Sequence, residues 1–190
     1  MGLLDTILGR SKPVKPNLDE LFALPSAAIT LEAGANLRPT GVGSVCVKPA
    51  EGGGFVGLRE QIDQLLAVDN DKYDETKDSF GFSWITRRGD PGDVADLIAD
   101  LHSVNASLAD AGFGPALLCT LVVFTGGDPG AADIGLVYLY KRGTWYPFAP
   151  SGKEQRDNAR ELQIRAVIGD DLKIEPDLSR WFPVWGAPGL

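Results

Sequence analysis

Apolar residues recur along this chain in two kinds of pattern, and each kind predicts a different secondary structure. Every second residue is aromatic from Phe80 to Trp84, which predicts a strand with one apolar face. Almost every residue over 117–124 is apolar, which is typical of a central strand buried on both faces. Pro147 favours an edge position for the last strand. The sequence predicts six strands, at residues 27–32, 40–48, 80–86, 117–124, 134–140 and 144–148.

Apolar residues three and four positions apart predict four helices, over 18–24, about 56–68, 90–112 and about 151–168. Asp90 is expected to cap the third helix, and Ser151 with Glu154 forms a capping box that predicts the start of the fourth. The acidic stretch 69–78 is interpreted as a solvated loop. Short turns between consecutive strands indicate an α+β fold, in which helices pack on a largely antiparallel sheet.

The first residues form a separate pattern. Four apolar residues stand at helical spacing before a basic stretch, which predicts a short amphipathic helix: Leu3, Leu4, Ile7 and Leu8. Pro13 and Pro16 then stiffen a linker. We expect residues 1–16 to be an N-terminal arm and linker, and residues 17–190 to be a single α+β domain. Whether the arm folds back on the domain or contacts a membrane or partner stays open, because two helical turns bury little surface.

The last fourteen residues, DLSRWFPVWGAPGL, are unusually aromatic for a chain end. Leaving these side chains in water would favour aggregation, so we expect an extended segment docked on the domain, with one helical turn around 177–181. At least one of Trp181 and Trp185 should then be largely buried. A displayed recognition peptide is the competing interpretation. In the preceding hairpin, Trp145 and Tyr146 point to opposite faces, so we expect one to be buried and the other partly exposed.

The composition and charge of the chain limit the classes of partner and the cellular location that we expect. The chain has 190 residues with 44% hydrophobic and 23% charged residues, as in ordinary globular proteins. Its net charge of -8 makes nucleic acid a poor partner. Cys46 and Cys119 lie in apolar runs, which favours reduced thiols and a cytoplasmic location. No apolar stretch reaches the roughly 18 residues of a membrane span, so the strongest expected membrane contact is weak, peripheral and through residues 1–15.

No stretch carries a recognisable catalytic, cofactor or metal motif. Gly52, Gly54 and Gly57 match a dinucleotide fingerprint, but Glu51 would repel a pyrophosphate and the strand ends too early. His102 is the only histidine, which excludes multi-histidine metal sites. We interpret it as a residue at the solvent edge of its helix. Four carboxylates fall near a calcium-loop pattern: Asp69, Asp71, Asp74 and Glu75. Tyr73 replaces a required oxygen ligand and the turn glycine is absent, so we interpret them as part of the solvated loop.

Several long blocks of the sequence carry a family resemblance. They are the opening MGLLDTILGR, the central SLADAGFG, the hairpin YLYKRGTWYPFAP and the ending EPDLSRWFPVWGAPGL. Together these blocks resemble the PspA-associated protein PspAB family of actinobacteria over the whole chain. The resemblance implies a cytoplasmic protein associated with PspA, the coiled-coil membrane-stress protein of the phage-shock response, and it implies no catalytic residues. The order of elements is also loosely similar to the YbjN and type III secretion chaperone-like folds.

Two hypotheses follow. The first is a non-enzymatic protein-binding adaptor or regulator in a PspA-linked envelope-stress response, at the inner face of the membrane or free in the cytoplasm. Its partner would be PspA or another stress-response component. The second is a small-molecule binder or enzyme whose pocket lies among Gly52, Gly54, Arg87, Arg88 and the aromatic hairpin. We expect no cofactor or metal, and the residues expected to bind a partner are Leu3, Leu4, Ile7, Leu8, Trp145, Tyr146, Trp181 and Trp185.

Overall fold

The computed structural model describes residues 16–48, 57, 60, 62–64, 72–127 and 132–190. Six strands form one sheet in the order β2-β3-β1-β4-β5-β6, and each neighbouring pair is antiparallel. The strands are β1 (Leu37–Val47), β2 (Tyr73–Lys77), β3 (Ser83–Arg88), β4 (Leu117–Gly126), β5 (Ile134–Leu139) and β6 (Thr144–Phe148). A two-stranded ribbon follows, with β7 at Pro150–Gly152 and β8 at Gln155–Arg156. The α+β class with an antiparallel sheet is confirmed.

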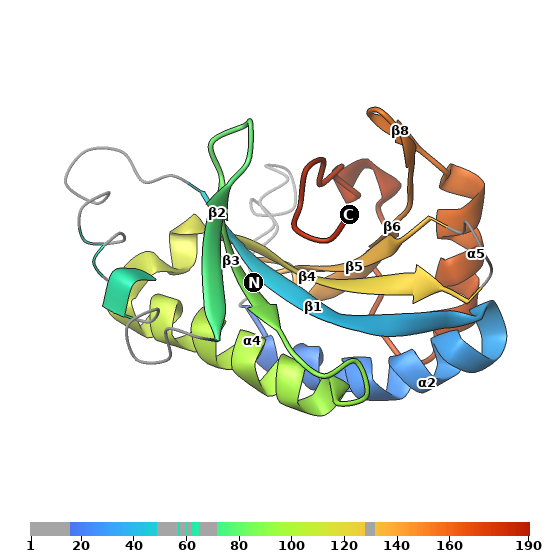
Figure 1. The fold of residues 1–190 in the computed structure, drawn as a ribbon, viewed down its shortest axis with the longest axis horizontal. Coiled ribbons are helices and arrows are strands. Elements are labelled where there is room, and N and C mark those ends of the chain that lie inside the picture. Colours follow the sequence, from blue (N-terminus) through green and yellow to red (C-terminus); the bar gives the residue numbers. More distant parts are fainter. Residues whose placement is uncertain (1–15, 49–56, 58–59, 61, 65–71, 128–131) are drawn as a thin grey trace, which may run out of the picture.

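Helices cover one face of this sheet (Figure 1). The α-helices are α2 (Leu24–Ala35), α4 (Val94–Leu108) and α5 (Asn158–Ile168). Shorter helical segments are η1 (Leu18–Ala23), η2 (Ala109–Phe113), η3 (Gly114–Ala116) and η4 (Leu178–Arg180). No helix of the described chain is both long and apolar enough to cross a bilayer.

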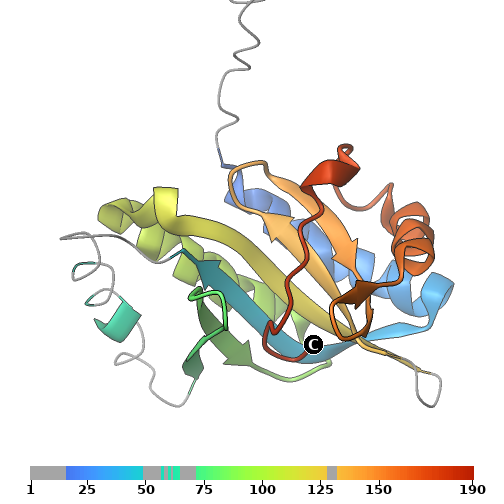
Figure 2. The same ribbon diagram turned by 90° about the horizontal axis from the view of Figure 1, so that it is seen from above.

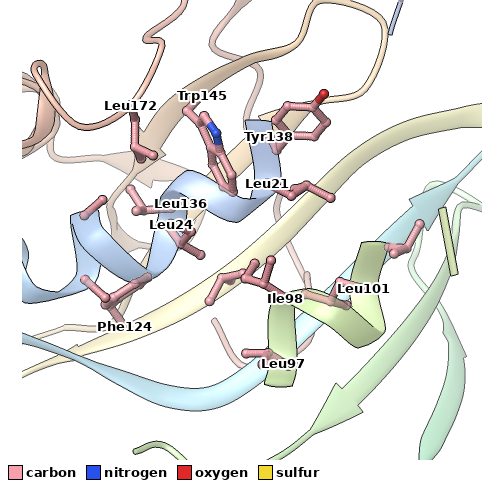
Figure 3. Close-up of a cluster of buried hydrophobic side chains, with 14 of the residues drawn as sticks. Leu21, Leu24, Leu97, Ile98, Leu101, Phe124, Leu136, Tyr138, Trp145 and Leu172 are labelled. Atoms are coloured by element: carbon pink, nitrogen blue, oxygen red, sulfur yellow. The ribbon is translucent and has the colours of Figure 1, made fainter. Parts of the chain in front are cut away.

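The main core lies between the sheet and these helices (Figure 3). Leu24 of α2 and Leu97 of α4 are almost fully buried there with Phe124 of β4. Trp145 of β6 reaches the same core and donates an indole hydrogen bond to the Glu20 carbonyl oxygen at 3.3 Å. The alternate side chains of β4 and β6 face the opposite side of the sheet, where they form a second apolar cluster.

One predicted strand is wrong. Residues 27–32 belong to helix α2, which begins at Leu24 with Pro25 in its first turn. Proline is favoured at the first helical position, because its missing N–H has no helical partner there in any case. Leu24, Ala28 and Leu31 then face the core at helical spacing, and Asn36 ends the helix in the left-handed conformation.

Three further boundaries differ from expectation. Part of the acidic stretch interpreted as a loop is strand β2, at the sheet edge, where charged side chains are common. Helix α4 is capped by Asp93, which accepts a hydrogen bond from the Asp96 N–H, rather than by Asp90. The capping box is also wrong. Residue 151 lies in β7, Glu154 lies in a turn, and α5 is capped by Asp157.

The C-terminal segment crosses the face of the sheet opposite the helices (Figures 1 and 2). Its first part lies beside the edge strand β6 and is joined to it by two backbone hydrogen bonds. The Trp145 backbone N–H donates to the Lys173 carbonyl oxygen, and the Trp145 carbonyl oxygen accepts from the Glu175 N–H, each at 2.8 Å. The short helix η4 follows at the expected place, and Trp181 is only 5% exposed. The expected docking of the aromatic chain end is confirmed for Trp181.

The expectation for the hairpin is wrong. Trp145 and Tyr146 do point to opposite faces, but both are buried, since helices cover one face and the C-terminal segment covers the other. The predicted helix at 56–68 lies mostly outside the described residues, although the described positions within it are helical and Ile62 is buried. The predicted arm at residues 1–15 lies outside them entirely, so the division at residue 16 stays a prediction.

Candidate functional site

The sheet face opposite the helices holds an apolar groove of about 780 Å³. One row of directly opposed residues on four adjacent strands contributes to its floor. Trp84 of β3 lies opposite Cys46 of β1, and Cys46 lies opposite Cys119 of β4. Cys119 in turn lies opposite Leu139 of β5. Tyr146 of β6 completes the lining of this floor.

The turn between β2 and β3 forms one wall of the groove, and a single carboxylate organises it. Asp78 accepts hydrogen bonds from the N–H groups of Phe80 and Phe82 through one oxygen, at 2.9 and 3.0 Å. Its other oxygen accepts the indole N–H of Trp84 at 3.0 Å. Gly81 adopts a φ of 84°, which glycine allows without strain. The turn thereby holds its two phenylalanines beside the tryptophan of the floor.

The C-terminal segment forms the other wall through residues 182–185. The Tyr146 hydroxyl donates a hydrogen bond to the Phe182 carbonyl oxygen at 2.8 Å. Trp185 packs edge-on against Phe148 of β6, with ring centroids 4.9 Å apart. The wall is therefore fixed to the sheet by one polar and one aromatic contact.

Charged side chains border the groove, and Lys141, Arg142 and Asp78 are engaged in contacts within the fold. Arg142 lies 3.2 Å from the buried carboxylate of Glu175. Lys141 donates to a backbone carbonyl oxygen at 2.8 Å. Two acids, Asp78 and Glu154, also line the groove, so the basic and acidic groups there are balanced in number.

The lining of the groove is suited to binding apolar groups. A hydrogen bond with Cys119 and burial raise the pKa of the Cys46 thiol, so this thiol stays protonated and is a weak nucleophile at neutral pH. Burial raises the pKa of Tyr146, which keeps its hydroxyl a hydrogen-bond donor. Within the described ranges, no group of three or more metal-ligating side chains comes together.

Two large apolar side chains of the walls remain exposed to solvent. Phe80 on one wall and Phe182 on the other are each 59% exposed. Elsewhere in the described chain, exposed large apolar residues such as Ile29 and Leu162 lie on helices and do not line the groove. The groove therefore combines a concave apolar floor with exposed aromatic edges, a combination typical of binding sites.

The residues expected to bind a partner are distributed over different parts of the fold. Trp145 is buried in the core beneath the helices, and Trp181 stacks on Tyr146 with ring centroids 5.8 Å apart. Tyr146 and Trp185 line the groove. The four apolar residues of the arm lie outside the described residues.

The alternative pocket of the sequence analysis overlaps the groove only at the aromatic hairpin, whose Tyr146 lines it. Arg87 is held by Asp100 at 2.7 Å, and Arg88 lies 3.7 Å from Asp74. Neither arginine lines the groove. Gly52 and Gly54 lie outside the described residues.

His102 packs on the Phe22 ring, with centroids 4.9 Å apart, and keeps a side-chain exposure of 27%. It is therefore a residue at the edge of its helix, as expected.

The sequence reasoning missed the cysteines and Asp78 as parts of a site. The alternation of Phe80, Phe82 and Trp84 was a usable signal for one apolar face, and all three line the groove. Nothing in the sequence placed Cys46 beside Cys119, because their contact depends on the register of β1 against β4.

These features define a class: an α+β protein with an apolar groove between a hairpin turn and its own C-terminal segment. Comparison with protein families matches the model described as PspA associated protein B over residues 1–189. The chain belongs to this PspAB family. Neither the curated proteins nor the solved structures contain a significant match.

Proposed function

We propose that this protein is a non-enzymatic adaptor in a PspA-linked envelope-stress response, and that it binds an apolar segment of a protein partner in the groove. The observation that carries the proposal is the groove itself, with Phe80 and Phe182 exposed on opposite walls. The family description supports a protein partner through its association with PspA. PspA or another component of the same response is the proposed partner.

The arrangement of the groove supports a binding role. Its floor belongs to central strands and its walls are held by hydrogen bonds, so the site is largely formed before a ligand arrives. Aromatic side chains such as Phe80 and Phe182 bury large apolar areas when a partner covers them. The raised pKa of Cys46 argues against a thiol-based reaction at the same place.

Affinity purification from the native cell tests this proposal. Phe182→Glu places a charge in the groove, whereas Leu178→Glu makes the same change at a 50% exposed site of the same segment outside it. We expect Phe182→Glu to lower the amount of copurified stress-response protein at least tenfold, and Leu178→Glu to leave it unchanged. Both variants should keep the wild-type melting temperature within a few degrees. Equal recovery of partners by the two variants would contradict the groove as the binding surface.

A second function has one observation in its favour. The groove volume of about 780 Å³ falls within the range of small-molecule sites, roughly 300–1,000 Å³. A ligand found by native mass spectrometry in the purified protein, and lost in Phe182→Glu, would favour this function over the adaptor. The weak peripheral membrane contact expected of residues 1–15 stays a prediction, which sedimentation with anionic vesicles tests.

A further inference from the structure

The described chain starts near the β5–β6 turn, on the helix-covered side of the sheet. The Tyr138 hydroxyl donates a hydrogen bond to the Asn17 carbonyl oxygen at 2.6 Å. Asn17 also lies near Gly143 in the turn between β5 and β6, since a Cβ atom added at residue 143 would be 3.7 Å from the Asn17 Cβ atom. The same turn contains Lys141 and Arg142, which line the groove. The described chain therefore starts near a turn whose Lys141 and Arg142 line the groove on the opposite face of the sheet.

The arm is long enough to enter the groove of its own chain. Fifteen residues span up to roughly 50 Å when extended, and a helix over residues 3–8 would be roughly 9 Å long. Residues 9–15 then remain as a connector of roughly 20 Å when extended. A connector of this length can pass from Asn17 around the β5–β6 turn to the opposite face of the sheet.

The chemistry of the arm complements that of the groove. Leu3, Leu4, Ile7 and Leu8 stand at helical spacing in the sequence, which predicts one apolar stripe, and the groove presents an apolar floor with aromatic walls. The arm has three of the 18 basic residues and one of the 26 acidic residues, so its net charge is +2. Because the whole chain carries -8, the rest carries -10 and attracts the arm.

We propose that residues 1–15 fold back and place this apolar stripe in the groove of the same chain, where the arm competes with an incoming apolar segment. Docking of the arm stands on its own, whereas competition with a protein partner rests on the proposed function. Tethering gives a short arm an effective concentration on the order of 1 mM. If a separate arm peptide binds the groove with a dissociation constant of about 0.1 mM, the effective concentration of the tethered arm is about ten times that constant. The arm then occupies the groove in about nine molecules out of ten. The apparent affinity of any competitor falls about tenfold as a result.

The test measures binding of a fluorescent peptide of residues 1–15 to the full-length chain by anisotropy. The wild type is compared with an arm variant that carries Leu3→Ser, Leu4→Ser, Ile7→Ser and Leu8→Ser. We expect the peptide to bind the arm variant about tenfold more tightly, because the variant's own arm no longer fills the groove. Adding Phe182→Glu to the arm variant should abolish binding, whereas adding Leu178→Glu should preserve it. A cooperative unfolding transition within a few degrees of the wild-type melting temperature confirms that each variant is folded, because loss of arm docking by itself lowers the melting temperature by only a few degrees.

Three results would overturn the proposal. Equal peptide affinity for the wild type and the arm variant would mean that the arm does not occupy the groove. A wild-type dimer that dissociates in the arm variant would assign the arm to a second copy. Arm-dependent binding to anionic vesicles, without peptide binding at the groove, would assign it to a membrane surface. The anisotropy experiment contains no partner protein. Its outcome for arm docking is therefore independent of whether the adaptor proposal succeeds or fails in cells.

Discussion

The docking of the C-terminal segment predicts a large and unequal effect at two adjacent aromatic residues. Trp181 is 5% exposed, stacks on Tyr146 and donates its indole N–H to the Glu175 carbonyl oxygen at 3.0 Å. A buried aromatic side chain removes about 150–250 Å² from water, which corresponds to about 4–6 kcal/mol at 25 cal/mol per Å². Measured tryptophan-to-alanine changes in cores cost about 3–5 kcal/mol. We therefore expect Trp181→Ala to lower the free energy of unfolding by about 4 kcal/mol.

Thermal unfolding followed by circular dichroism measures this effect. For a chain of this size, about 4 kcal/mol lowers the melting temperature by about 8–16 °C. Phe182→Ala is the matched control, because Phe182 is the next residue and is 59% exposed. Its loss should stay below about 1 kcal/mol. Equal shifts of the melting temperature in the two variants would refute the docked arrangement of the segment.

Two further predictions concern buried charge and helix capping. Burial acts to raise the pKa of Glu175, but hydrogen bonds from Thr144, a backbone N–H and Arg142 outweigh it and hold the pKa below its ordinary value of 4.5. The contribution of Glu175 to the free energy of unfolding is therefore fully present above pH 4.5 and is lost as the pH falls through the lowered pKa. Urea unfolding should show that Glu175→Gln loses less stability on acidification than the wild type does. An identical acid dependence would contradict this assignment. Asp157→Ala should lower the free energy of unfolding, measured with urea, by about 1 kcal/mol, and Ser151→Ala should lower it by less than about 0.5 kcal/mol. The reverse order would favour Ser151, the capping-box residue, as the cap of α5.

Five of the six strands of the sheet were predictable, because each of these five carries a local signal in the sequence. The continuous apolar run of β4 indicated burial on both faces, and Pro147 indicated the edge position of β6, which the structure confirms. Helix α2 differs from the predicted strand at 27–32 because Pro25, which follows the predicted helix 18–24, stands in the first turn of a new helix. Strand β2 was missed because its charged residues resemble a loop, and only pairing with β3 makes them a strand.

The groove could not be predicted in the same way, because its residues meet only through tertiary structure. Trp84 and Leu139 are far apart in sequence, and cross-strand register across four strands places them in one row. The opposite wall comes from residues 182–185, whose position depends on contacts such as that of Tyr146 with Phe182. Sequence patterns show which residues are apolar. The shape of a groove depends instead on which apolar residues are left without packed neighbours in the folded chain, and that is set by tertiary contacts.

The apolar pattern of β4 also explains why the groove is where it is. A strand that is apolar on both faces needs cover on both faces, and the helices supply it on one side over the full length. On the other side the C-terminal segment covers Leu121 and Val123, which are both nearly inaccessible. It leaves Cys119 at the floor of the groove with Phe80 and Phe182 exposed above it. The strand residues of the floor, such as Cys46 and Cys119, are themselves nearly inaccessible, so the apolar surface that an arm or a partner would cover is mainly that of Phe80 and Phe182 on the walls.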